Sequence, residues 1–302
     1  MGALALAIAH LTLPGTLYLV ATPIGHLGDI TLRALDVLRR ADLVLAEDTR
    51  RTALLLRHYG IATPLRSLYA QNEEARLPEV LARLERGESL ALVADAGTPL
   101  VSDPGARLVR AALEAGHAVV PVPGPSAVLA ALVVSGLPAD RFLFLGFPPR
   151  RGAARARWLR QAAQSPVPVV MFEAPGRVVE LLEALVATAG SERFAVLARE
   201  LTKLHEEVRR GPVAELAAQA REEPPRGEVV VVLAGAPEDP APEVEITDAP
   251  AAVEDFARAL LAAGRRPSEA ARELARRLAW PRRAAYEQVR RVHEKHANDD
   301  TT

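Results

Sequence analysis

Two groups of charged side chains stand directly after apolar runs of the sequence. One group follows the run 43–46 and the other follows the run 167–172. A carboxylate at the end of a strand can act as a general base toward a molecule bound there. The alternatives are helix capping together with Thr49 for the first group and an ion pair with Arg177 for the second. The candidate catalytic residues, with the base unassigned, are Glu47, Asp48, Arg50 and Glu173.

Three loops rich in glycine, proline and small polar residues follow other apolar runs. They span residues 21–29, 95–105 and 121–127 and contain no lysine or arginine. Ligands of α/β proteins lie outside the carboxyl ends of the strands, and small residues let backbone groups approach them closely. Such a cradle suits a neutral or cationic ligand, for example adenosine bearing a sulfonium, better than a polyphosphate. Asp103 precedes Pro104 and is expected to cap the next helix.

Several common chemistries lack their usual residues. The chain has no cysteine, which excludes disulfides, thiolate catalysis and cysteine-built zinc sites. No G-x-G stretch occurs, and neither Lys203 nor Lys295 stands in a phosphate-binding loop. His293 and His296 come closest to a metal pair, and we expect them to be solvated, with no metal site.

Alternating apolar runs and helical periodicity predict an α/β fold. In the first part, strands are predicted over 17–22, 43–46, 90–94 and 118–121, and helices over 31–41, 49–59, 74–86, 104–115 and 125–135. This alternation favours parallel pairing. In the second part, strands are predicted over 142–147, 167–172, 193–198, 205–210 and 228–233, and helices over 155–164, 176–188 and 212–220. More strands per helix indicate a mixed sheet there.

The domain organisation follows from these patterns. We predict an N-terminal extension at 1–15, an α/β domain at 16–138, a second α/β domain at 139–236, an acidic proline-rich linker at 237–250 and a basic helical module at 251–302. Helices are expected over 251–263, 268–279 and 281–293. The apolar first thirteen residues lack the basic start and cleavage site of a signal peptide, and no uncharged run is long enough for a membrane span. We therefore expect a cytoplasmic protein that does not contact a membrane.

Arginines gather in two places, although the formal net charge is −1. Residues 143–172 contain no acid, and a flexible arginine loop is predicted over 147–157 beside Trp158. Residues 258–291 carry ten arginines against three glutamates. Cationic surfaces of this kind bind nucleic-acid phosphates, and bases stack on aromatic rings. The alternatives are a solvated loop with Trp158 in the core, and a plain helix bundle or dimer contact. The candidate RNA contacts are Arg150, Arg151, Arg155, Arg157, Arg265, Arg266, Arg282 and Arg283.

Seven ordered segments between about residue 16 and residue 235 carry a family resemblance. They are LYLVATPIGHLGDITLRALDVLRRADLVLAEDTR, LVADAGTPLVSDPG, PVPGPSAVLAALVVSGLP, FLFLGFPPR, MFEAPGR, ARELTKLHEE and RGEVVVVL. Together they resemble the bacterial small-subunit ribosomal RNA methyltransferase I family of the tetrapyrrole methylase superfamily. RRPSEAARELARRL and PRRAAYEQVRR are similar, less specifically, to that family's terminal helical domain. His26 departs from the family, which mostly has asparagine there.

The resemblance implies a fold, a cofactor and an activity. It implies a homodimer with the two-domain class III S-adenosylmethionine methyltransferase fold, a small C-terminal helical module, and the cofactor in the cleft between the α/β domains. The implied reaction is methylation of a cytidine ribose 2′-oxygen in 16S rRNA. The cofactor residues carried over are Pro23, Asp95, Gly97, Thr98, Pro99, Val101, Ser126, Ala127, Phe172, Ala198 and Gly227. For Gly97 and Pro99, turn formation alone is the alternative. A methyltransferase of a small tetrapyrrole and a non-catalytic rRNA-binding assembly factor remain the rival functions.

Overall fold

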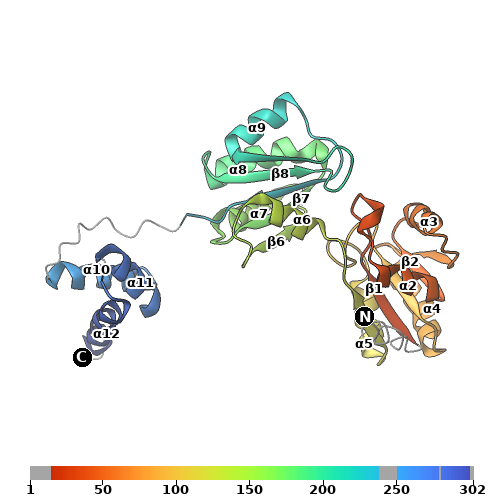
Figure 1. The fold of residues 1–302 in the computed structure, drawn as a ribbon, viewed down its shortest axis with the longest axis horizontal. Helices are drawn as coiled ribbons and strands as arrows, with labels where there is room; N and C mark the ends of the chain where they lie inside the picture. Colours follow the sequence, from red (N-terminus) through yellow and green to blue (C-terminus); the bar gives the residue numbers. More distant parts are fainter. Residues whose placement is uncertain (1–14, 238–249, 279, 300–302) are drawn as a thin grey trace, which may run out of the picture. The chain divides into compact units, whose positions relative to one another are not determined.

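The structure is a computed structural model that describes residues 15–237, 250–278 and 280–299. The chain divides after Ala236 into two compact units. In its described part the first unit contains two five-stranded sheets with their helices, and the second contains three helices (Figure 1). The prediction of an α/β fold with a C-terminal helical region is confirmed. The predicted extension up to residue 14 and the linker residues 238–249 lie outside the described residues.

The first sheet is parallel and has the strand order β3-β2-β4-β1-β5. Its strands are β1 (Thr16–Val20), β2 (Leu43–Ala46), β3 (Leu65–Ser67), β4 (Leu90–Val93) and β5 (Ala118–Val122). The helices of this part are η1 (Leu27–Asp29), α2 (Leu32–Arg40), α3 (Thr49–His58), α4 (Glu73–Glu85), α5 (Ala106–Glu114) and α6 (Ala127–Ser135). Every residue of β2 and β4 is buried, as expected for parallel strands covered on both faces. Strand β3 was not predicted, because it is only three residues long and not apolar throughout.

The second sheet is mixed, as predicted, with the order β6-β7-β10-β8-β9. Its strands are β6 (Leu143–Gly146), β7 (Val169–Glu173), β8 (Phe194–Arg199), β9 (Glu207–Pro212) and β10 (Val229–Leu233). Only β6 and β7 pair in parallel, and the other neighbours are antiparallel. The helices are α7 (Gly152–Gln164), η2 (Pro175–Arg177), α8 (Val178–Ala189) and α9 (Val213–Glu222). The loop predicted over 147–157 ends at Arg151, and its prediction beyond that residue is wrong, because the Ala- and Arg-rich segment from Gly152 favours helix.

The second unit consists of α10 (Pro250–Ala262), α11 (Pro267–Leu278) and α12 (Arg282–Asp299) in its described part. They enclose a small core of their own, in which Phe256, Leu274 and Val289 are fully buried. The guanidinium of Arg277 lies over the Phe256 ring, 5.0 Å from its centroid, and so covers one side of this core. The arginine-rich faces of these helices remain outside it. Among the described residues, no helix is both long and apolar enough to cross a membrane.

Candidate active site

The loop after β4 is fastened to the loop after β1 through backbone hydrogen bonds. The Thr22 N–H donates to the Gly97 carbonyl at 2.9 Å, and the Gly97 N–H donates to the Thr22 carbonyl at 3.0 Å. Gly97 has φ +86°, which favours glycine, and a Cβ there would lie 3.4 Å from Ile24 Cγ2. Leu100 and Ser102 also have positive φ, at 74° and 67°. The loop 94–105 therefore holds a specific strained shape that is fixed at the carboxyl end of the sheet.

A pocket of about 440 Å³, which we call the Asp103 pocket, opens beside this loop. It receives residues from both α/β parts of the first unit, and its volume lies in the range typical of small-molecule sites. The predicted cofactor residues that line it are Asp95, Gly97, Thr98, Val101, Ser126, Ala127, Phe172 and Gly227. The structure thus brings these residues together from distant parts of the sequence, and their binding role remains a prediction.

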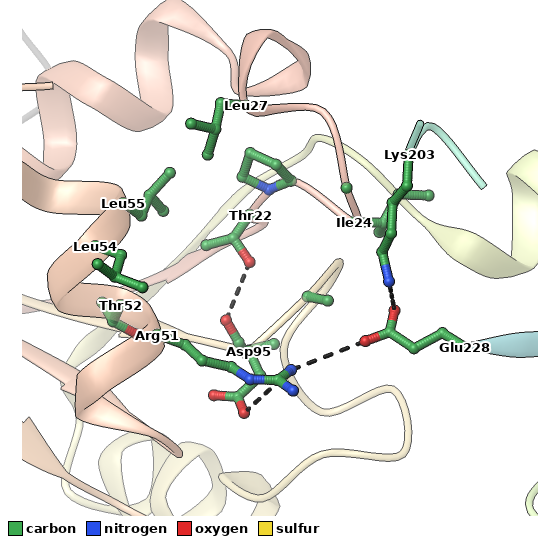
Figure 2. A pocket seen from close by; sticks show the side chains of 14 residues that line it. Thr22, Ile24, Leu27, Arg51, Thr52, Leu54, Leu55, Asp95, Lys203 and Glu228 are labelled. Carbon is green, nitrogen blue, oxygen red and sulfur yellow. Dashed lines mark hydrogen bonds and ion pairs between the residues drawn. The ribbon is translucent and has the colours of Figure 1, made fainter. Parts of the chain in front are cut away.

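Three predicted cofactor residues lie elsewhere. Pro23 lines a second pocket of about 290 Å³, the Pro23 pocket, drawn in Figure 2. Pro99 is buried and Ala198 is fully buried in β8, and neither lines either pocket. Ala198 packs in the core cluster beneath the site, so the structure places it under the pocket wall and not on it.

The Asp103 pocket has a strongly acidic lining. Its charged residues are five carboxylates and one guanidinium, namely Glu47, Asp95, Asp103, Glu173, Glu228 and Arg51. A polyphosphate would face repulsion from such a lining, whereas a cation would be attracted. Gly97 can form the turn and line the pocket at the same time, because the turn itself shapes the pocket.

Asp103 occupies this pocket and does not cap a helix, so the expectation of capping is wrong. Helix α5 begins at Ala106, and its N-cap is Gly105 with φ +119°. Burial, the charge of Glu47, a hydrogen bond with the Glu47 carboxyl group and the charge of Asp95 together raise the pKa of Asp103 to about 7, and burial contributes most. The Asp-Pro pair is typical of a local helix start. Its place in the same loop as Asp95 was the sequence signal for the pocket.

Asp48 caps the start of helix α3, which is the structural alternative to a catalytic role. Its side chain accepts the Arg50 N–H at 2.9 Å, which makes Asp48, and not Thr49, the N-cap of α3. The Arg50 guanidinium also binds both oxygens, at 3.0 and 2.8 Å, and this hydrogen bonding lowers the pKa of Asp48 to about 2. Neither Asp48 nor Arg50 lines the two pockets. A carboxylate so well satisfied is a poor general base.

Glu173 ends β7 and lines the Asp103 pocket with a buried side chain. Its Oε1 lies 3.6 Å from Arg177 Nη1 and accepts the Ala174 N–H at 2.9 Å. The ion pair with Arg177, the alternative to a catalytic role for Glu173, is therefore present. Its Oε2 is buried and accepts no hydrogen bond from the described residues. A buried oxygen in this state calls for a donor, which a molecule bound in the pocket would supply.

Arg51, on α3, was missed by the sequence analysis and joins the two α/β parts at the site. Its Nη1 lies 3.9 Å from Asp95 Oδ2 and 3.8 Å from Glu228 Oε1. Lys203 Nζ lies 3.3 Å from Glu228 Oε2 and 2.7 Å from Glu200 Oε1. Figure 2 shows Arg51 reaching between Asp95 and Glu228, with Lys203 on the other side of Glu228. Arg51, Asp95 and Glu228 line both pockets, and Lys203 lines only the Pro23 pocket.

The arginines predicted to contact RNA have different surroundings. Arg150, Arg151 and Arg157 are exposed at the start of α7. Arg155 is instead buried and pairs with Glu180 at 3.0 Å, so it does not form part of that surface. Trp158 is also in the core, where it donates to the Leu145 carbonyl at 3.1 Å, and the idea that bases stack on it is wrong.

The arginines of the second unit lie at its helix starts and connections. Arg265 and Arg266 join α10 to α11, and Arg282 and Arg283 begin α12. Arg266, Arg282 and Arg283 are exposed. Within the ranges the structure describes, no group of three or more His, Cys, Asp or Glu residues is arranged to hold a metal ion. The side chain of His296 lies outside the described residues.

Sequence comparisons identify related proteins. The family of tetrapyrrole (corrin/porphyrin) methylases matches residues 16–217. A ribosomal RNA small subunit methyltransferase I from Synechocystis sp. is 44% identical over 273 residues, 90% of this chain and 96% of that protein. The protein of the same name from Xylella fastidiosa (strain Temecula1) is 53% identical over 206 residues, 68% of this chain and 76% of that protein. The resemblance stated from the sequence is thereby confirmed.

Solved structures show the same fold. A cobalt precorrin-4 methyltransferase matches with a TM-score of 0.59 and 18% identity, over 73% of this chain and 95% of that chain. A uroporphyrin-III C-methyltransferase from Thermus thermophilus matches with a TM-score of 0.52 and 24% identity, over 72% of this chain and 94% of that chain. At this identity the likeness concerns the fold. With the sequence matches, it shows that the chain belongs to the tetrapyrrole methylase family and, within it, to the ribosomal RNA small subunit methyltransferase I proteins.

Proposed function

We propose that this protein transfers a methyl group from S-adenosylmethionine to the ribose 2′-oxygen of a cytidine in 16S rRNA. The acidic Asp103 pocket carries this proposal, because it offers small residues and carboxylates to a cationic donor. Membership in the rRNA methyltransferase I group supports the RNA substrate. The specific atom methylated, the cytidine 2′-oxygen, rests on the family resemblance.

The residues of the pocket fit S-adenosylmethionine. Gly97, Thr98 and Gly227 would let the ligand approach the backbone, Phe172 would offer it an apolar surface, and a ligand group could donate to Glu173 Oε2. The bound cofactor would supply an electrophilic methyl group on a sulfonium. The chain would supply alignment of the ribose hydroxyl with that methyl group, an effect that can lower a barrier by about 7–11 kcal/mol.

The proposed RNA contacts are the exposed arginines at the start of α7 and those of the second unit. Residues 143–172 contain no acid, so Arg150, Arg151 and Arg157 have no acidic neighbour in that stretch of sequence. Residues 258–291 carry ten arginines against three glutamates. Arginine binds phosphate bidentately, and phosphate contacts supply much of the affinity for nucleic acid.

One assay distinguishes the proposed function from its rivals. The purified protein is incubated with methyl-labelled S-adenosylmethionine and, separately, assembled 30S particles, naked 16S rRNA and porphyrin precursors. We expect label in the ribose of a cytidine in the RNA. Label in the pigment alone would establish a tetrapyrrole methyltransferase, and RNA binding without label would establish an assembly factor. Label on a base would refute the 2′-oxygen as the acceptor.

Thr98→Arg tests the position of the cofactor. Thr98 lines the pocket, and its hydroxyl donates to the Pro125 carbonyl at 3.3 Å. An arginine there fills the space and adds a positive charge against the sulfonium, so we expect loss of S-adenosylmethionine binding by calorimetry with an unchanged far-UV circular dichroism spectrum. Thr188→Arg, on the exposed part of α8, serves as the control. Unchanged affinity in Thr98→Arg would place the cofactor elsewhere.

We also infer that two copies of the chain associate and that the protein acts in the cytoplasm. The family resemblance supports the homodimer, and Leu129 and Val133 on α6 expose apolar side chains that an interface would cover. An rRNA substrate supports the location. Sedimentation equilibrium checks the association, and Val133→Glu is expected to weaken it. A monomer at micromolar concentration in the unaltered protein would refute the homodimer.

A further inference from the structure

Three carboxyl groups from two segments of the chain line the Asp103 pocket. Glu47 follows β2, Asp95 follows β4, and Asp103 lies farther along the same loop as Asp95. The Glu47 carboxyl group lies close enough to Asp103 for its charge and a hydrogen bond to raise the pKa of Asp103. Two carboxyl groups can share a hydrogen bond in this way only when one of them holds a proton. This pair of carboxyl groups is therefore a place where a proton can be stored.

A fourth carboxylate shows that the pocket is built for a ligand. Glu173 is 2% exposed, lines the same pocket, and its Oε2 accepts no hydrogen bond from the described residues. Burial of an unpaired carboxylate oxygen is costly. A hydroxyl or amine of a bound molecule would satisfy it. The carboxyl groups of the pocket thus face a ligand site, and they are not merely a solvated acidic cluster.

The surroundings single out Asp103 and Glu47 among these carboxyl groups. Asp95 accepts the Asp48 N–H at 2.9 Å and lies 3.9 Å from Arg51. Glu173 lies 3.6 Å from Arg177. For Glu47 and Asp103, by contrast, no ion pair within 4.0 Å is formed with any described residue. Their negative charge is therefore the least compensated at the site.

We propose that Asp103, positioned by Glu47, is the catalytic residue that accepts the proton of the ribose 2′-hydroxyl during methyl transfer. This inference rests on the proposed function. The O–H bond breaks as the oxygen forms its bond to the methyl carbon. The carbon–sulfur bond breaks with its electron pair remaining on sulfur, and the proton passes to the Asp103 carboxylate. A carboxyl group is a more effective base when its proton affinity is matched to neutral pH.

Charge coupling between donor and base follows from this arrangement. With a pKa near 7, Asp103 is protonated in part of the molecules at neutral pH. The other charged groups that face it from the pocket lining are Glu47, Asp95, Glu173, Glu228 and Arg51. A sulfonium bound in the pocket favours the carboxylate, whereas the neutral demethylated product does not. Binding of S-adenosylmethionine is thus expected to expel the Asp103 proton and so to prepare the base.

Calorimetry tests this coupling without any turnover. Binding of S-adenosylmethionine and of S-adenosylhomocysteine is measured at pH 7 in two buffers that differ in ionisation enthalpy. For the unaltered protein we expect S-adenosylmethionine to release about half a proton more than S-adenosylhomocysteine. In Asp103→Asn this difference disappears, and in the exposed control Asp140→Asn it persists. An equal proton release for the two ligands in the unaltered protein would refute the proposal.

Kinetics test the role in catalysis. Asp103→Asn is expected to lower kcat about 10²–10⁴-fold with little change in KM for RNA, and Asp140→Asn is expected to leave kcat unchanged. Glu47→Gln removes a negative charge beside Asp103, so the acidic limb of the pH–rate profile should move to lower pH. A folded Asp103→Asn variant that retains full activity would refute the assignment of the base, and the proposed function would stand. A lack of RNA methylation by the unaltered protein would refute the function itself.

Discussion

The carboxyl group of Asp103 takes its charge state from residues that the fold brings to it. Glu47 comes from the end of β2 and Asp95 from the end of β4, and both repel a negative charge on Asp103. Burial removes the water that would otherwise stabilise that charge. Burying these negative charges is unfavourable in the free protein, but the same uncompensated charges attract a cationic ligand.

This residue makes folding stability depend on pH. The folded protein binds more protons at Asp103 than the unfolded chain does between the ordinary pKa of 3.8 and about 7, so stability falls as pH rises through that window. The Asp103→Asn variant has no titrating group at this position, so its stability does not fall in this window for that reason. Because Asp103 is half-buried, we expect the variant's free energy of unfolding to gain about 1–2 kcal/mol over the unaltered protein between pH 5 and pH 8. Urea unfolding at both values checks this, and a gain that is independent of pH would contradict it.

Gly227 shows how tightly backbone and side chains fit beside the pocket. It has φ +82°, and a Cβ would lie 2.2 Å from Glu200 Oε1. That carboxylate is held by Lys203 Nζ at 2.7 Å and by the Glu228 N–H at 2.9 Å, so it cannot move without losing these bonds.

Gly227→Ala is therefore expected to lower the free energy of unfolding by about 1–3 kcal/mol. Gly116→Ala is the matched control, because Gly116 also has a positive φ, +78°, and nothing lies within 4 Å of the added Cβ. Chemical denaturation of both variants measures the difference. Equal stabilities would mean that the Glu200 side chain gives way freely.

At the scale of the element, helix α7 combines a structural face with a cationic face. Its buried side includes Arg155, Trp158 and Leu159, and its other side exposes Arg157 and Arg160. An amphipathic helix usually turns apolar residues inward and charges outward. Arg155 departs from this pattern because Glu180 neutralises its guanidinium and the Pro149 carbonyl accepts from it at 3.3 Å.

The two arginines of α7 should respond differently to mutation. Arg155→Ala removes a buried, paired side chain, and we expect the free energy of unfolding to fall by about 1–3 kcal/mol. Arg157→Ala, two residues away and exposed, should change stability by less than about 0.5 kcal/mol and should weaken RNA binding. Thermal unfolding and filter binding measure the two effects. A stable Arg155→Ala protein with impaired RNA binding would restore Arg155 to the RNA surface.

At the scale of the whole molecule, the acidic pocket and the arginine-rich stretch 258–291 belong to different units of the chain. The first unit contains the acidic pocket. The second unit has its own buried core and, over residues 258–291, ten arginines against three glutamates. A positive surface within the pocket would weaken binding of a cationic donor. Within the pocket lining, the guanidinium of Arg51 stands against five carboxylates.

Removal of residues 237–302 tests this division. We expect RNA affinity to fall by at least about tenfold at low salt, with a shallower dependence on salt, because phosphate contacts are lost. S-adenosylmethionine affinity should not change, since none of the residues lining the Asp103 pocket belongs to the second unit. Equal losses of both affinities would show that the second unit is a structural support.

The sequence by itself determined the alternation of strands and helices, the two sheets and the loops that surround the pocket. These features depend on local apolar periodicity and on glycine and proline, which act over a few residues. The family resemblance likewise rests on local segments. The loop predicted over 147–157 is too long at its C-terminal end, because its arginines are compatible with either an exposed loop or a helix.

Only the tertiary structure decided which charges meet. Asp103 resembled a helix cap in the sequence, Asp48 and Arg50 resembled catalytic residues, and Arg155 resembled a surface contact. Their burial and partners come from chain segments that are far apart in the sequence, such as Glu47 for Asp103 and Glu180 for Arg155. Charge interactions depend on distance and on exclusion of water, and neither quantity is encoded in local spacing.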